Sequence, residues 1–167
     1  MRRLALCLVL SVVGVSALAA AQAGDPQKIT RHGVGELRIG MTHKEARELG
    51  LVGRKRRGCP LGGSDTRAAK LKPPLEGSVN YTLNRPRKVR DITVEGGATA
   101  RGVGIGDRIR DIKDAYPKAK VDHSTDDTFE LTLVKIPRHG GGKLRFGVST
   151  KTKRITLIGV PYIAFCE

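Results

Sequence analysis

A stretch of the chain occurs twice, and this repeat constrains the fold more than any other feature of the sequence. When position 39 is aligned with position 105, Ile39-Gly40 falls on Ile105-Gly106, and the charged positions that follow agree in sign. Both blocks have a short apolar lead-in, a glycine turn and an amphipathic helical pattern. Further along, the two copies align with a slightly smaller difference in residue number, which places Ile92-Thr93-Val94 on Ile155-Thr156-Leu157. We therefore expect two tandem repeats, at about 33–97 and 98–162, rather than two units that are alike by chance.

Capping signals predict where the two helices begin and end. Thr42 and Glu45 form a T-x-x-E capping box, and Gly50 follows at the position where a positive φ ends a helix. In the second copy Asp107 is the expected N-cap. Pro117 is expected to end that second helix.

The later part of each repeat alternates between apolar and polar residues, as strands do. The expected strands are Ser78–Leu83, Lys88–Glu95, Thr128–Ile136, Lys143–Ser149 and Arg154–Val160, with a glycine hairpin at Gly140-Gly141-Gly142. A polar stretch, Arg54–Gly77, is expected to be a long loop. Strands joined by short turns pair antiparallel. The predicted fold is therefore α+β: two tandem helix-plus-antiparallel-strand repeats form one sheet with helices packed on one face.

The N-terminus has the three parts of a secretory signal. Met1-Arg2-Arg3 is positively charged, 4–20 is an uncharged apolar run, and Ala21-Gln22-Ala23 fits a cleavage site. We expect residues 1–23 to be removed, leaving one exported domain at 24–167. An uncleaved membrane anchor is the alternative, although the run is short and contains two serines and a glycine. No later segment of the sequence is expected to span a membrane.

Removal of the signal would leave two of the three cysteines, Cys59 and Cys166. An even number of cysteines in an oxidising compartment predicts a disulfide bond between them. A bridge that closes so long a loop is worth roughly 4–5 kcal/mol in the chain-entropy model. Two free thiols are the alternative.

The chain carries a formal net charge of +15, and its cations gather in three clusters. The clusters are Arg54, Lys55, Arg56 and Arg57; Arg85, Arg87, Lys88 and Arg90; and Lys143, Arg145, Lys151, Lys153 and Arg154. The second and third occupy corresponding places in the two repeats, which predicts a duplicated basic rim that attracts anionic partners. A solvated basic surface that serves solubility is the alternative. Nucleic acid is not expected as a partner, because few aromatic residues lie among the cations.

No motif predicts catalysis, a metal site or a cofactor. The histidines and cysteines lack metal-ligand spacing. Gly102-x-Gly104-x-Gly106 lacks the spacing of a phosphate-binding loop and is interpreted as a turn into a helix. His123 with Asp126 and Asp127 is interpreted as a solvated turn rather than a cation site. We expect a non-enzyme; the alternative is a hydrolase whose site combines His123, Asp127 and Ser64.

The segment 37–46, LRIGMTHKEA, followed by Leu49-Gly50, resembles the helix start of two related kinds of exported protein. These are the small outer-membrane-assembly lipoproteins of the SmpA/OmlA type and the tandem-repeat β-lactamase inhibitory proteins (BLIP) of actinobacteria. In that superfamily two repeats form a curved sheet whose concave face holds a partner protein. The resemblance implies a secreted, non-catalytic binding protein that engages a protein partner through its sheet face or basic rim. A basic cell-envelope protein that binds anionic wall polymers is the alternative.

Overall fold

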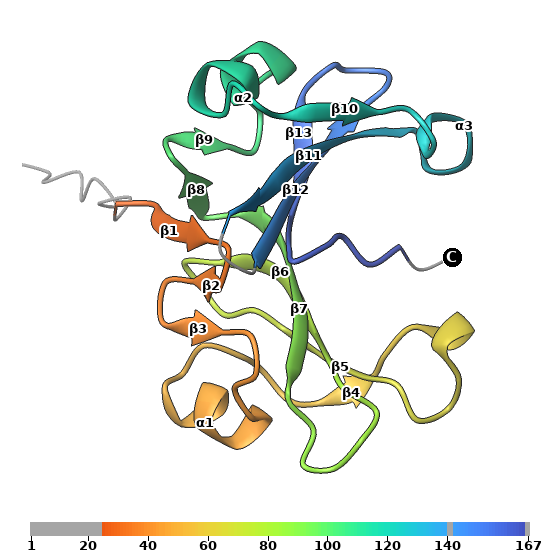
Figure 1. Cartoon of the computed structure of the whole chain (residues 1–167). Coiled ribbons are helices and arrows are strands. Elements are labelled where there is room, and N and C mark those ends of the chain that lie inside the picture. Colours follow the sequence, from red (N-terminus) through yellow and green to blue (C-terminus); the bar gives the residue numbers. More distant parts are fainter. Residues whose placement is uncertain (1–24, 140–141, 166–167) are drawn as a thin grey trace, which may run out of the picture.

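The structure, a computed structural model, describes residues 25–139 and 142–165 (Figure 1). The first half contains β1 (Gln27–Thr30), β2 (Gly33–Val34), β3 (Leu37–Arg38), α1 (His43–Glu48), β4 (Arg56–Arg57), the 3-10 helix η1 (Pro60–Gly62), β5 (Arg67–Lys70), β6 (Glu76–Tyr81) and β7 (Val89–Gly96). The second half contains β8 (Ala98–Ala100), β9 (Val103–Gly104), α2 (Ile109–Ala115), β10 (Lys120–Asp122), α3 (Asp126–Phe129), β11 (Leu131–His139), β12 (Gly142–Ser149) and β13 (Ile155–Val160). Within the described ranges the strands form a five-stranded sheet, β3-β2-β1-β8-β9, and an eight-stranded sheet, β10-β11-β12-β13-β7-β6-β5-β4.

The expected single sheet with helices packed on one face is wrong, because the molecule is mostly β and has two sheets. α1 and α2 are six and seven residues long, and the residues they bury are Ala46 and Ile112. Helices this short cannot cover an eight-stranded sheet, so the five-stranded sheet covers one face, with α1 and α2 at its two ends (Figure 1). One apolar core joins the two sheets; it includes Ile29, Leu37 and Val103 from the smaller sheet and Val79, Ile92, Val94, Phe146 and Ile158 from the larger.

The long loop expected across Arg54–Gly77 is also wrong. This stretch contains β4, η1, β5 and the first residues of β6. β5 pairs antiparallel with both neighbours, with Arg56 opposite Ala68 and Ala69 opposite Val79. Alanine has a low preference for strands. The sequence of β5, RAAK, therefore gives almost no strand signal, and its pairing partners decide its conformation.

The helix starts depend on local hydrogen bonds, and one of the two expected caps is confirmed. The Thr42 hydroxyl accepts a hydrogen bond from the Glu45 amide at 3.3 Å, and the Glu45 carboxylate accepts one from the Thr42 amide at 2.7 Å. Asp107 is not the N-cap of α2, because Arg108 occupies that position. The Arg108 amide donates to the Asp111 carboxylate at 2.7 Å.

The same backbone hydrogen bond recurs at equivalent positions of the two halves. The Gly40 amide donates to the Val89 carbonyl at 2.8 Å, and the Gly106 amide donates to the Ile155 carbonyl at 2.9 Å. Each bond ties the turn before a helix to the first residue of a long strand, β7 or β13. The equivalent of Ile155 is therefore Val89, and the smaller shift expected for the final strands, which placed Ile92 on Ile155, is wrong.

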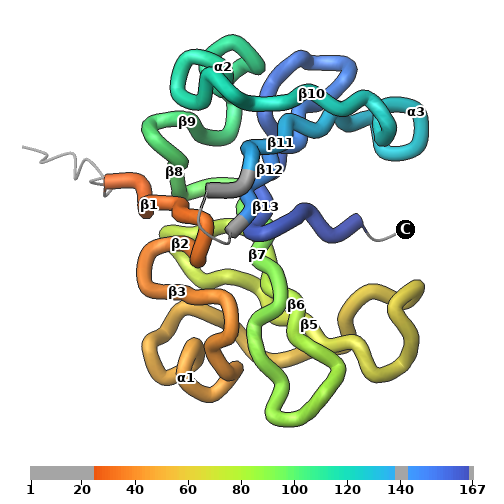
Figure 2. Tube along the Cα trace, in the orientation of Figure 1, coloured from red at the N-terminus to blue at the C-terminus, as the bar shows by residue number. Residues whose placement is uncertain are grey.

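With this equivalence the two halves are related by an approximate twofold axis. β7 and β13 lie side by side and antiparallel, with Thr93 opposite Gly159, which is its equivalent in the second repeat. On each side of this pair, Ile158 lies opposite Val94 and Val160 opposite Ile92. Figure 2 shows the first half largely below and the second half largely above this central pair of strands.

The C-terminal segment, residues 161–165, crosses the outer face of the eight-stranded sheet, on the side away from the five-stranded sheet (Figure 1). Two glycines allow this close approach. A Cβ atom on Gly159 would lie 2.5 Å from the Tyr162 backbone, and one on Gly147 would lie 3.1 Å from the Ile163 side chain. The segment ends with Phe165 stacked on Phe129 at 4.2 Å between ring centroids.

Some expectations concern residues that the structure does not describe. Residues 1–23, Gly140-Gly141 of the glycine hairpin, and Cys166 lie outside the described ranges. Cys59 takes part in a disulfide bond, and its pairing with Cys166 stays a prediction. Among residues 25–139 and 142–165, no helix has the length and apolar character needed to cross a membrane.

Candidate anion-binding site

A cleft of about 590 Å³ lies on the outer face of the eight-stranded sheet, beside the C-terminal segment. We call it the arginine cleft, because four arginines from three strands line it: Arg56, Arg57, Arg67 and Arg90. Apolar side chains lie among these cations. Leu61 and Leu83 are 75% and 51% exposed, and Phe165 also lines the cleft. The cleft can therefore present both positive charge and apolar surface to a bound molecule.

An ion pair with a buried aspartate positions one of these arginines. Asp91 is fully buried, and its carboxylate accepts hydrogen bonds from Asn80 Nδ2 at 2.7 Å and from Arg90 Nε at 2.9 Å. Partial burial opposes the charge of Arg90, but the hydrogen bond and the negative charge of Asp91 outweigh it and raise the pKa of Arg90. In the second half, Thr156 and Leu157 stand at the equivalent positions. This ion pair is therefore specific to the first repeat.

Tyr81 belongs to the apolar core, and its hydroxyl has no hydrogen-bond partner among the described residues. Tyr81 lines the cleft, is only 1% exposed, and packs its ring edge-on against His43 at 5.6 Å between centroids. Burial raises the pKa of Tyr81 to about 12. An unsatisfied buried hydroxyl costs about 1–3 kcal/mol. The ring packs against His43 of α1, which does not line the cleft, so this hydroxyl is not counted among the groups of the binding surface.

Arg67 was missed by the sequence analysis, which placed it in a loop. Its guanidinium donates to the Ser64 and Thr66 carbonyls, both at 2.7 Å, and so holds the segment after η1 against β5. The place of Arg67 in the cleft could have been predicted only if β5 had been recognised in the sequence as a strand paired with β4. That signal is weak because β4 contains only Arg56 and Arg57.

Two smaller hollows extend the positive surface from the arginine cleft. One, of about 450 Å³, is lined by Lys55, Arg56, Arg57, Ser64, Arg67 and Arg87. The other, of about 370 Å³, includes Lys55, Arg85 and Arg87. The structure therefore brings most of the first and second predicted clusters together. Arg54 and Lys88 are exposed nearby in sequence but line neither hollow nor the cleft.

The third predicted cluster lies in the second half, apart from the arginine cleft. Lys143, Arg145, Lys151, Lys153 and Arg154 line none of the three hollows described above. Two of these cations have partners within their own half. Lys151 forms an ion pair with Glu130 at 2.6 Å, and Arg154 donates to the Gly106 carbonyl at 2.7 Å.

The balance of charge also differs between these two regions. The arginine cleft and its two hollows have no aspartate or glutamate among their lining residues. At their margin Asp65 approaches Arg87 only to 3.8 Å and is largely exposed. In the second half, by contrast, carboxylates contact Lys151 and Lys135. Arg90 of the cleft is paired with Asp91 in the same way, but Arg56, Arg57 and Arg67 have no carboxylate partner among the described residues. These three arginines are therefore the best placed to bind an anion.

The ion pair between Asp122 and Lys135 gives a pH-dependent prediction. The Lys135 hydrogen bond and the Ser124 amide hold the pKa of Asp122 well below its usual value. A carboxyl group with a lowered folded-state pKa stabilises the fold above its unfolded pKa of about 4 and loses that effect as the pH falls through the folded pKa. We expect Asp122→Asn to destabilise the protein at neutral pH, with a difference from wild type that shrinks below about pH 4.

Urea unfolding of both proteins across this pH range measures that difference. Asp114→Asn, an equal change of charge at an exposed position on α2, controls for net charge. A destabilisation by Asp122→Asn that stayed constant down to strongly acidic pH would contradict the proposed role of the ion pair.

The residues of the alternative hydrolase site are divided between the two halves. Ser64 lines a hollow beside Arg67, whereas His123 and Asp127 belong to the region around α3. His123 Nδ1 lies 2.8 Å from the carboxylate of Asp126, and the expected turn there is the short helix α3. In the described part of the chain, no group of three or more His, Cys, Asp or Glu side chains could hold a metal ion.

The resemblance to the β-lactamase inhibitory protein superfamily stays a prediction from the sequence. No protein-family model, curated protein or solved structure matches this chain.

Proposed function

We propose that this protein is an exported, non-catalytic binding protein that holds an acidic segment of a partner protein in the arginine cleft. One observation carries the proposal: four arginines and several apolar side chains line a single cleft whose lining includes no carboxylate. Arginine binds a carboxylate through two parallel hydrogen bonds, which gives geometric specificity as well as charge.

The mixture of arginine and apolar surface favours a protein partner over an anionic wall polymer. Protein interfaces are enriched in arginine and aromatic residues at their centres, and the energy is concentrated in a few such anchors. A polymer with repeating charges requires only a cationic surface. Leu61, Leu83 and Phe165 would then have no role in binding, although all three line the cleft.

The proposal is tested by comparing a defined peptide with a defined polymer. The probes are a synthetic peptide that alternates glutamate and leucine, polyglutamate of the same length, and a polyglycerol-phosphate chain. Binding is measured by isothermal titration calorimetry at low salt and again at about 0.5 M salt, where charges separated by more than a few ångströms are screened. We expect the peptide with leucine to bind most tightly and to retain most of its affinity at high salt.

Two outcomes would overturn this function. Equal binding of all three probes, lost in parallel as the salt concentration rises, would show that charge alone governs binding and would favour the wall-polymer alternative. Absence of measurable binding to any probe would remove the arginine cleft as a binding site. If the peptide binds as expected, capture of exported proteins at high salt can then be used to identify the natural partner.

A further inference from the structure

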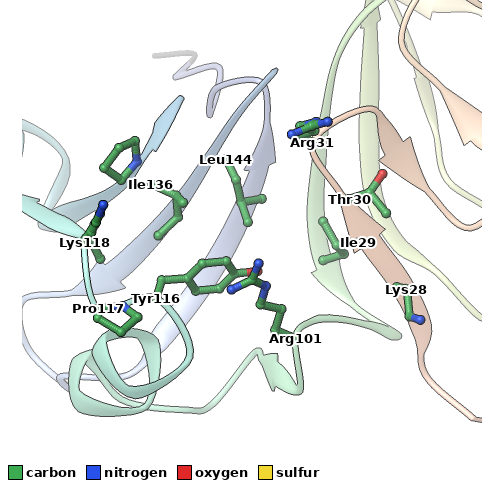
Figure 3. A pocket seen from close by; sticks show the side chains of 12 residues that line it. Lys28, Ile29, Thr30, Arg31, Arg101, Tyr116, Pro117, Lys118, Ile136 and Leu144 are labelled. Atoms are coloured by element: carbon green, nitrogen blue, oxygen red, sulfur yellow. The ribbon is translucent and has the colours of Figure 1, made fainter. Parts of the chain in front are cut away.

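A second cavity, of about 640 Å³, separates β1 of the first half from the second repeat (Figure 3). Most of its wall is apolar, with Ile29 on one side and Tyr116, Ile136 and Leu144 on the other. Its volume lies within the range of about 300–1,000 Å³ typical of sites for small molecules. The cavity shares no lining residue with the arginine cleft.

The polar residues of this cavity are nearly all cations. Lys28, Arg31, Arg101 and Lys118 contribute to its lining, and no aspartate or glutamate does. In Figure 3, Lys28 and Arg31 belong to the β1 side and Lys118 to the opposite side, with Arg101 between them. An apolar cavity with a cationic margin complements a molecule that has an apolar body and one negative charge.

Arg101 has an unusual backbone conformation and a positioned side chain. Its φ is +53°, in the left-handed region that non-glycine residues rarely adopt. The guanidinium lies 4.9 Å from the centroid of the Tyr116 ring and donates to the Ala115 carbonyl at 3.2 Å. In the first repeat the equivalent positions are Gly35, with φ +56°, and Gly50. Both the cation and the aromatic ring are therefore features of the second repeat alone.

The corresponding residues of the first repeat are buried in the core. Val52 forms an isolated β-bridge with Leu71, and Leu75 is buried in the core. The strand registers make Ala119 and Ile136 the equivalents of Val52 and Leu71 in the second repeat. Both line the cavity and are only partly buried, whereas Val52 and Leu71 are buried in the core. These two positions are therefore covered in the first repeat and border the cavity in the second.

We propose that this cavity binds a free single-chain carboxylic acid, with its acyl chain against Tyr116, Ile136 and Leu144 and its carboxylate at Arg101. Arg101 can hold the carboxylate because its charge is already oriented by Tyr116 and the Ala115 carbonyl. An acyl chain matches the apolar wall, and its single charge matches the cationic margin. This site is independent of the arginine cleft and does not depend on the function proposed for it.

The test uses dodecanoate as the probe and titration calorimetry as the measurement. We expect a saturable site with a dissociation constant of about 1–100 μM. Dodecanol, which has no charge, is expected to bind at least about tenfold more weakly, since a charged hydrogen bond contributes about this much. The chain has no tryptophan, so displacement of a fluorescent acyl carboxylate provides a second readout with little background.

Arg101→Gly is the variant of choice, because Gly35 adopts nearly the same φ at the equivalent position and the turn should keep its shape. We expect dodecanoate to bind it about tenfold more weakly, with the binding of dodecanol unchanged. Arg54→Gly removes an exposed cation outside the cavity and is the matched control. Circular dichroism and the melting temperature establish that both variants are folded.

The proposal would be overturned by no saturation by dodecanoate up to about 1 mM, by equal affinities for dodecanoate and dodecanol, or by unchanged binding in Arg101→Gly. Binding to vesicles of anionic phospholipid without binding to free dodecanoate would also overturn it. Charge reversal at Arg56 and Arg57 should leave dodecanoate binding intact. Failure of this site and failure of the arginine cleft are therefore distinguishable.

Discussion

Replacing both Arg56 and Arg57 with glutamate is expected to weaken binding of an acidic partner at least about 1,000-fold, or about 4 kcal/mol. Each reversal removes a charged hydrogen bond worth about 1.5–3 kcal/mol and adds repulsion against the partner's carboxylates. Both side chains are exposed on the short strand β4 and line the arginine cleft. Folding should therefore be little affected, and calorimetry with the glutamate–leucine peptide gives the loss directly.

The matched control for this variant is Lys143→Glu with Lys153→Glu. It changes the net charge by the same amount, and both lysines are exposed in the second half, away from the cleft. We expect it to reduce binding less than about fivefold, the effect of long-range charge alone. Equal losses in the two double variants would contradict a defined binding site and would show that net charge controls the interaction.

Phe146→Ala is expected to destabilise the protein by about 4 kcal/mol, within the range for truncation of a buried phenylalanine. Phe146 is fully buried in the middle of β12, opposite Val134 on β11 and Ile158 on β13. Its ring also packs against Tyr116 at 6.0 Å between centroids. Truncation would leave a cavity where the sheet meets the region below α2, because strands on both sides prevent collapse.

Urea unfolding measures this loss as a lower midpoint with a nearly unchanged slope. Phe146→Leu keeps most of the apolar volume and should cost less than about 2 kcal/mol. Leu49→Ala, at an exposed position that follows α1, should cost less than about 1 kcal/mol. A small effect of Phe146→Ala, similar to that of Leu49→Ala, would contradict the central place of Phe146 in the core.

The helix starts could be predicted from the sequence because their causes are local. The Thr42–Glu45 capping box involves two positions within one helical turn, and Gly50 has a φ of +72° directly after the cap of α1. The prediction failed by one position at α2, where Asp107 and Arg108 compete for the cap. Asp107 accepts a hydrogen bond from the Gly104 amide at 2.8 Å instead, which stabilises the preceding turn.

Sheet membership could not be predicted to the same extent, because it depends on residues far apart in sequence. β1 pairs in parallel with β8, with Gln27 opposite Ala98, and this contact joins the two halves into the five-stranded sheet. Neither strand has a strong apolar pattern of its own. Because the sequence does not predict this second sheet, the short helices were the only elements expected to cover the larger sheet. The predicted fold was wrong for that reason.

The cations of the candidate site were visible in the sequence, but their arrangement was not. The cluster at 54–57 and the cluster at 85–90 meet because β4, β5, β6 and β7 are consecutive strands of one sheet. Arg67 joins them only because β5 lies between β4 and β6. The cluster at 143–154 corresponds in the repeat to the cations at 85–88, yet the approximate twofold axis places it in the other half.

The sequence by itself determined the repeat, the helix starts, most of the long strands and the excess of positive charge, since these depend on neighbouring residues and on composition. Only the tertiary structure decided that two sheets enclose the core, that the arginine cleft forms in one repeat, and that the cavity beside Arg101 stays open in the other. The physical reason is that equivalent residues of the two repeats have diverged at a few positions, such as Gly35 and Arg101. The effect of each such change depends on which distant strand or segment packs against it.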